Sequence, residues 1–160
     1  YHVWPELSKA ILFLITLLGA CAGSTGGGFK VSRLVILWRS VKNEISAAIH
    51  PRSIKKIHME GRIVGEGTVR SVLVYTAIYT MIFLVSLLLL SLNEFDFVTN
   101  ISAVAANFNN VGPGFHMVGP AGNYAQFSGF SKFVLMFDML AGRLELLPIL
   151  VLFSVKTWRE

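Results

Sequence analysis

Charged residues are scarce in this sequence. Only 14% of its 160 residues are Asp, Glu, Lys or Arg, whereas 54% are hydrophobic. Soluble domains carry about 25% charged residues, so the composition excludes an ordinary soluble domain and indicates an integral membrane protein. Cysteine is almost absent too, since Cys21 is the single copy. One cysteine excludes a disulfide within the chain.

Clusters of metal-binding residues are also lacking. Zinc sites usually draw their ligands from closely spaced pairs of cysteine or histidine. We therefore expect no metal site. We also expect no covalently bound cofactor and no enzymatic activity. The four histidines are scattered, at His2, His50, His58 and His116.

Positive charge is concentrated in one region. The net charge is +5, and nine of the fourteen Lys and Arg lie within residues 30–70, which hold three acids. A basic run can mark a nucleic-acid site, but between apolar segments it more simply marks a cytoplasmic loop. We expect residues 39–70 to form a cytoplasmic connection without a nucleic-acid partner. Lys156 and Arg159 place the C-terminus on the same side.

Three apolar stretches divide the chain. Residues 72–92 and 133–153 are each long enough to cross a bilayer as a helix, which needs ~20 residues. Residues 10–22 are too short alone and resume as residues 31–38, which predicts a helix broken in the middle. The expected fold class is therefore an all-α integral membrane protein. A small β-hairpin around residues 60–61 is expected in the cytoplasmic connection.

The segment between the last two apolar stretches combines a short helix with a turn. Asp96 is a favoured N-cap, and residues 97–107 can form about three helical turns. Glycine and proline within residues 109–114 forbid a continuing helix. A short helix followed by an irregular strand indicates a re-entrant pore loop, whose carbonyls can bind a dehydrated cation. The alternative is an ordinary extracellular loop with a Gly-Pro turn.

A glycine-rich segment interrupts the first apolar stretch. Residues 23–30 read GSTGGGFK, which lacks the Gly-Lys-Ser/Thr ending of a nucleotide-binding Walker A loop. Small residues at regular spacing can mark tight helix packing, but three adjacent glycines weaken a helix by ~1 kcal/mol each. An unwound, movable intramembrane loop fits better, with Ser24 and Thr25 able to satisfy freed backbone groups.

Three charged residues, Asp138, Arg143 and Glu145, lie within the last apolar stretch. Each costs ~2.5 to 3.5 kcal/mol at the centre of a membrane helix, so such groups usually face protein or water. At ~100° per residue Asp138 and Glu145 share one face, while Arg143 lies roughly 140° from Asp138. Arg143 is therefore expected to face another element or an aqueous pore. The alternative is a structural salt bridge between helices.

An internal repeat links the two ends of the chain. A shift of 123 residues aligns Tyr1 with Tyr124 and gives six identities in nineteen positions. Both segments are therefore expected to be a helix that descends after a pore loop. By the same shift, Gly112 corresponds to a glycine about eleven residues before Tyr1. We expect the chain to be the C-terminal piece of a longer protein.

On these features the chain resembles the Trk/Ktr/HKT superfamily of potassium transporters, and most closely its bacterial TrkH/TrkG branch. The resemblance covers essentially the whole chain and implies four helix–pore-loop–helix units around one pore. Residues 1–38 would be the broken descending helix of the third unit, and residues 71–160 the fourth unit. The motifs that carry the resemblance are residues 19–28, 109–114, 141–145 and 153–160.

The resemblance also implies K⁺ uptake across the bacterial inner membrane through a selectivity filter of backbone carbonyls. K⁺ would bind the carbonyls of Asn110, Val111 and Gly112. The implied filter comprises Asn110, Val111, Gly112, Pro113 and Gly114. The implied gate comprises Gly23, Ser24, Thr25, Gly26, Gly27, Gly28 and Arg143, with Lys30, Asp138 and Glu145 as supporting polar groups.

The implied partners are a second copy of the chain, in a homodimer, and a cytoplasmic nucleotide-binding subunit of the RCK type, similar to TrkA. The sequence is compatible with a channel and with symport driven by H⁺ or Na⁺. A different class of function is a secondary transporter or membrane protein whose broken helix binds an anionic substrate. A third reading is a segment that serves only folding or dimerisation.

Overall fold

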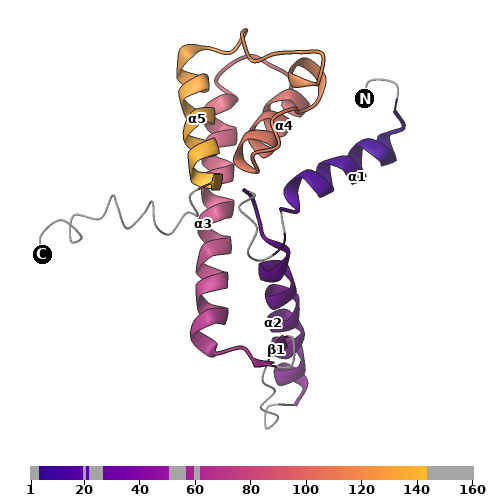
Figure 1. Ribbon diagram of the computed structural model, residues 1–160, viewed down its shortest axis with the longest axis vertical. Coiled ribbons are helices and arrows are strands. Elements are labelled where there is room, and N and C mark those ends of the chain that lie inside the picture. Colours follow the sequence, from indigo (N-terminus) through magenta and orange to yellow (C-terminus); the bar gives the residue numbers. More distant parts are fainter. Residues whose placement is uncertain (1–3, 20, 22–26, 51–56, 60–61, 144–160) are drawn as a thin grey trace, which may run out of the picture.

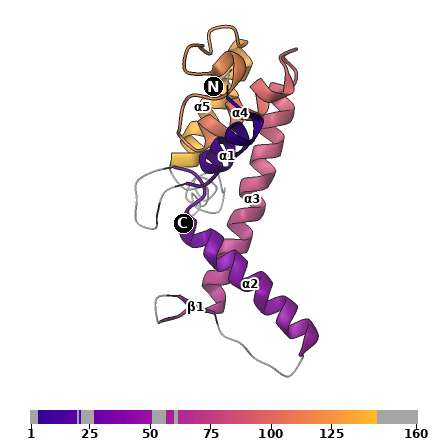
Figure 2. The ribbon, with the colours of Figure 1, turned by 90° about the vertical axis from the view of Figure 1, so that its right-hand side faces the viewer.

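The computed structural model describes residues 4–19, 21, 27–50, 57–59 and 62–143. Its helices are α1 (Glu6–Leu17), α2 (Val31–Ile49), α3 (Glu66–Leu90), α4 (Phe97–Phe108), the short 3-10 helix η1 (His116–Val118) and α5 (Gly129–Arg143). The long helix α3 packs against α2, α4 and α5, whereas α1 and η1 pack against α4. α4 and α5 lie against one end of α3, and α2 lies beside the other end (Figures 1 and 2). The expected helical architecture is confirmed.

The first apolar stretch forms two separate helices, α1 and α2. Between them Leu18 and Phe29 form an isolated bridge, and the Gly19 amide donates to the Phe29 carbonyl at 2.8 Å. α2 continues well beyond the apolar residues and ends at Ile49. It ends there because Pro51 disfavours helical backbone at the residue before it, His50.

Two short strands, β1 (His58–Met59) and β2 (Arg62–Ile63), lie in the connection between α2 and α3. They pair antiparallel, with His58 opposite Ile63. Residues 60–61, which would form the turn, lie outside the described residues, so the expected hairpin stays a prediction.

α3 is 25 residues long and begins at Glu66, six residues before the apolar stretch. Gly65 occupies the N-cap with extended backbone, and the acidic Glu66 in the first turn suits the positive end of the helix dipole. Among the described helices α3 is the one long and apolar enough to cross a membrane. Leu73, Met81 and Leu88 on its surface are exposed.

α4 is the buried centre of the fold. Asp96 caps its N-terminus by accepting a hydrogen bond from the Thr99 amide at 3.1 Å, which confirms the expected cap. Small side chains such as Ala103 and Ala106 are fully buried, and they allow α3 and α5 to approach closely. The core around α4 consists of Leu90, Ala103, Val104, Val118, Phe127, Val134 and Leu135.

α5 begins at Gly129, ahead of the apolar stretch that predicted it. Ser128 explains the earlier start, because its Oγ accepts a hydrogen bond from the Ser131 amide at 3.2 Å in the manner of an N-cap. Near the other end, Gly142 lies against the C-terminus of α4, where a Cβ would overlap the Phe108 carbonyl oxygen. Residues 144–160, and with them Glu145, lie outside the described residues.

Candidate functional site

The candidate site is the turn that follows α4. Asn110 and Gly112 have positive φ angles of 56° and 96°, which an asparagine tolerates and a glycine adopts freely. The amides of Val111 and Gly112 both donate to the Ala106 carbonyl, at 2.8 and 3.2 Å. The chain therefore reverses direction at the end of α4 instead of continuing away from it.

After the turn the chain runs back along α4. The Gly114 amide donates to the Val118 carbonyl at 2.8 Å, and the Phe115 amide donates to Ser102 Oγ at 2.9 Å. A Cβ at Gly114 would crowd Ser102 and Val118. A short helix and an extended return segment thus lie side by side.

The backbone at the turn is accessible. Val111 is 49% exposed, and Gly112 and Pro113 are exposed as well. Among the described residues, no donor forms a hydrogen bond with the carbonyl oxygens of Asn110, Val111 or Pro113. The Gly112 carbonyl differs, because Tyr124 Oη donates to it at 2.7 Å. Adjacent carbonyls with free lone pairs can serve as ligands for a cation.

Two asparagine side chains fasten the turn to its neighbours. Asn109 Nδ2 donates to the Ala105 carbonyl at 2.8 Å, and Asn109 Oδ1 accepts from Tyr79 Oη of α3 at 2.9 Å. Asn110 Nδ2 donates to the Met139 carbonyl of α5 at 3.2 Å. The turn is therefore held between α3 and α5.

The described end of the glycine-rich segment lies directly against these asparagines. A Cβ at Gly27 would come within 2.5 Å of Asn110 Nδ2, and one at Gly28 would overlap Asn109 Oδ1. Gly28 also has a positive φ of 86°. The structure therefore brings Gly27 and Gly28 together with the expected filter. The rest of the expected gate segment, residues 23–26, lies outside the described residues.

An aromatic cluster anchors the chain that follows the glycines. The Phe29 ring lies 6.0 Å from Tyr75 and 5.6 Å from Tyr79 of α3, and Tyr79 lies 4.5 Å from Phe108 of α4. The Arg33 guanidinium lies 3.8 Å from the centroid of the Tyr75 ring, a distance typical of a cation–π contact. Lys30, expected as a supporting group, occupies the N-cap position of α2.

The charged residues of α5 have different surroundings. Asp138 is fully buried, and Ser86 Oγ of α3 donates to its Oδ1 at 2.7 Å, while its Oδ2 has no hydrogen-bond partner among the described residues. Arg143 is the last residue of α5 and is exposed. No described carboxylate lies within ion-pair distance of Arg143. The structure therefore does not pair Asp138 with Arg143.

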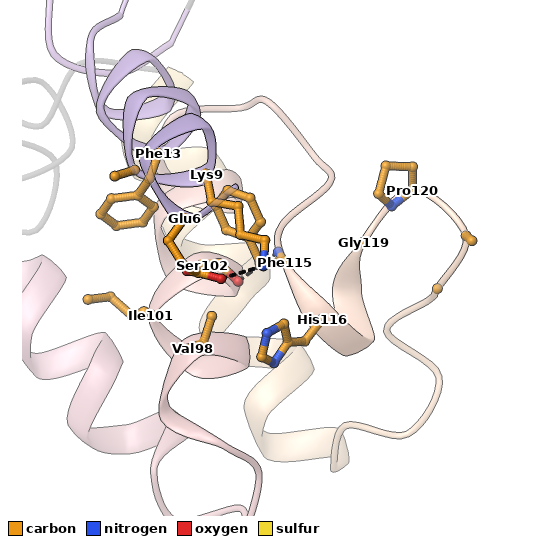
Figure 3. A pocket seen from close by; sticks show the side chains of 13 residues that line it. Glu6, Lys9, Phe13, Val98, Ile101, Ser102, Phe115, His116, Gly119 and Pro120 are labelled. Carbon is orange, nitrogen blue, oxygen red and sulfur yellow. Dashed lines mark hydrogen bonds and ion pairs between the residues drawn. The ribbon is translucent and has the colours of Figure 1, made fainter. Parts of the chain in front are cut away.

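A cavity of about 570 Å³ lies between α1 and α4 (Figure 3). On one side Phe13 of α1 faces Phe115, with ring centroids 6.4 Å apart. Lys9, which pairs with Glu6 at 2.7 Å, lies at its edge. Of the expected filter and gate residues that the structure describes, none lines this cavity.

Sequence reasoning gave no site role to Tyr79, Arg33 or Tyr124, although it placed Tyr124 in the internal repeat. The hydroxyl of a buried tyrosine usually finds a hydrogen-bond partner, so a tyrosine inside an apolar stretch is a usable indication. The partner of Tyr79 could not be predicted from the sequence, because Tyr79 and Asn109 are 30 residues apart.

Known proteins resemble this chain over nearly its whole length. The family model TrkH, described as a cation transport protein, matches residues 1–159. Trk system potassium uptake protein TrkH of Salmonella typhimurium is 35% identical over 157 residues, which are 98% of this chain and 32% of the relative. TrkG of Escherichia coli K12 is 35% identical over 160 residues, all of this chain and 33% of the relative.

A solved structure is also similar. The potassium transporter TrkH from Vibrio parahaemolyticus superimposes with a TM-score of 0.85 at 35% identity, covering 98% of this chain and 33% of that chain. The chain thus spans about a third of the length of the relatives it matches.

Proposed function

The chain belongs to the TrkH family of cation transport proteins, and on that premise we propose that it contributes one filter segment and part of the gate to a K⁺ uptake pore. The pore lies in the bacterial inner membrane, with α3 crossing the bilayer. Residues 39–70 and the C-terminus face the cytoplasm, because positive charge concentrates there. The protein acts as a transporter and not as an enzyme.

The observation that carries the proposal is the turn at residues 110–112. K⁺ sheds its hydration shell only where several carbonyl oxygens replace the water. The carbonyls of Asn110 and Val111 have no donor among the described residues, and the Gly112 carbonyl keeps one lone pair beside its bond to Tyr124. Corresponding segments of three further units complete the ring of ligands. The negative C-terminal end of α4 adds a favourable field for a cation.

The gate lies next to this filter segment. Gly27 and Gly28 contact Asn110 and Asn109. A movement of the glycine-rich segment therefore acts directly on the turn at residues 110–112, the filter turn. We assign the barrier to residues 23–28 together with Arg143. Glu145 and Lys30 support the gate, and Asp138 secures α5 against α3 through Ser86.

The partners of the pore are proposed from the resemblance to the family. We propose a homodimer regulated by a cytoplasmic nucleotide-binding subunit of the RCK type, similar to TrkA. Residues 1–38 and 71–160 belong to two successive pore units, and residues 39–70 connect them. Transport as a channel and transport as H⁺- or Na⁺-coupled symport differ in whether flux depends on a second ion gradient.

The test is Gly112→Ser in the intact protein, reconstituted in liposomes. A side chain at φ 96° is strained, so the carbonyls shift and the ratio of K⁺ to Na⁺ flux is expected to fall. Gly67→Ser is the matched control, because a Cβ meets open space at both positions and Gly67 lies in the first turn of α3. An unchanged flux ratio at normal protein abundance would remove Gly112 from the filter. Anion flux in place of K⁺ flux would favour the anionic-substrate transporter.

A further inference from the structure

Tyr124 lies in the loop between η1 and α5, behind the filter turn. Its hydroxyl donates to the Gly112 carbonyl at 2.7 Å and accepts from Asn107 Nδ2 of α4 at 3.1 Å. We propose that Tyr124 is a positioning residue for ion selectivity, because it fixes the direction of the Gly112 carbonyl. The inference deepens the proposed function and rests on it.

The Gly112–Pro113 peptide plane has few other interactions that could fix its orientation. Proline has no N–H, so this peptide plane offers its carbonyl as its single hydrogen-bonding group. Gly112 itself has no Cβ, and nothing lies within 4 Å of where one would be. Within the described residues, the bond from Tyr124 is therefore the hydrogen bond that sets the orientation of this plane. Without it, the carbonyl dipole can rotate.

The tyrosine is in turn held by α4. Asn107 Nδ2 donates to the Ala103 carbonyl at 2.7 Å as well as to Tyr124 Oη, so both of its hydrogens are used. Because Tyr124 Oη accepts from Asn107, its own hydrogen is directed to Gly112. The Asn107 side chain is 7% exposed, so the network is anchored in the core and not in a mobile surface group.

The ring of Tyr124 is also fixed in place. It lies 5.7 Å from the Phe127 ring, which lies 4.8 Å from the ring of Phe95, the residue before the N-cap of α4. Burial raises the pKa of the Tyr124 hydroxyl above its ordinary value, against a smaller opposing effect of the bond from Asn107. The hydroxyl therefore keeps its proton at physiological pH and remains a donor.

The internal repeat gives independent support in the sequence. The shift of 123 residues that aligns the two descending helices places Tyr1 on Tyr124. A tyrosine thus precedes both helices at the same position. This is expected if each pore unit uses a tyrosine to hold its filter turn.

The test is Tyr124→Phe in the intact protein, which removes the hydroxyl and keeps the ring beside Phe127. The ratio of K⁺ to Na⁺ flux per folded molecule in liposomes is expected to fall about fivefold, as for the loss of one hydrogen bond. Asn107→Ser, whose side chain is too short to reach Tyr124, is expected to lower the ratio in the same direction. Asn123→Ala is the control, because it removes a bond to the Ala125 amide in the same loop and leaves Gly112 untouched.

The outcomes separate the inference from the proposed function. If the unsubstituted protein does not prefer K⁺, the proposed function itself fails. If it prefers K⁺ and both variants keep the flux ratio, the inference is overturned, even where total flux or abundance falls. A lowered ratio in both variants with an unchanged ratio in Asn123→Ala supports it.

Discussion

At the scale of the residue, Asp96 joins the start of α4 to the segment that returns from the filter turn. Its carboxylate accepts from the Thr99 amide at 3.1 Å, and His116 Nδ1 lies 3.0 Å from its Oδ2. The side-chain hydrogen bond from Thr99 lowers the pKa of Asp96 below its ordinary value, and the contact with His116 lowers it further. Asp96 therefore contributes to stability as a carboxylate.

We expect Asp96→Ala to lower the free energy of unfolding by ~1 kcal/mol at neutral pH, the usual effect of losing an N-cap. Because the folded-state pKa is lowered, the contribution is complete above the unfolded-state pKa of about 3.9 and is lost as the pH falls through the folded-state value. Thermal unfolding in detergent across this acidic range measures both effects.

Asp96→Asn is the matched control for this prediction. Asparagine caps a helix about as well as aspartate, so stability at neutral pH should be largely kept, while the part of the acid dependence that comes from Asp96 disappears. Equal stability of the alanine variant and the unsubstituted protein at pH 7 would contradict a capping role for Asp96.

At the scale of the element, the close contact between α4 and α5 depends on Gly142. Because a Cβ there overlaps the Phe108 carbonyl, Gly142→Ala is expected to force the two helices apart at a cost of ~1 to 3 kcal/mol. Gly129→Ala, at the start of the same helix with open space around it, should be neutral or slightly stabilising. Melting temperatures of the two variants test the prediction, and equal values would show that the helices can separate freely.

The elements themselves were largely predictable from the sequence, because apolar runs and capping residues are local properties. Residues 97–107 and the cap at Asp96 were predicted almost to the residue. The starts of α3 and α5 were placed too late, at residues 72 and 133, because an apolar run marks the apolar part of a helix and not its polar first turns.

The contacts of the site could not be predicted in the same way. Gly112 was expected in the filter from its motif, but its bond to Tyr124 depends on how the return loop packs on α4. The approach of Gly28 to Asn109 depends on the path of the chain between α1 and α2. Such contacts are fixed by packing between distant elements, which hydrophobic periodicity does not encode.

At the scale of the whole molecule, the proposed gate predicts that K⁺ passes only when the barrier formed by residues 23–28 and Arg143 moves. A guanidinium about 4 Å from K⁺ repels it by several kcal/mol at an effective dielectric of about 20, and its charge is not titrated at working pH. We expect Arg143→Ala in the intact protein to raise K⁺ flux without the regulatory subunit. Flux per folded molecule in liposomes is the measurement.

Arg70→Ala, at an exposed position near the start of α3, is the control for the removal of one positive charge. If Arg143 instead formed a structural salt bridge, its removal would cost ~3 to 5 kcal/mol and lower both abundance and flux. A fall in flux per folded molecule would contradict the barrier.

The burial of α4 between α3 and α5 has a consequence for the order in which the protein is made. A helix of 12 residues is ~18 Å long and cannot reach across the ~30 Å hydrocarbon layer. It also carries the buried polar groups Asn100, Ser102 and Asn107, which lipid would not solvate. If α3 spans the membrane as proposed, we therefore expect α4 to enter the bilayer only after α5 has been synthesised and can cover its polar groups.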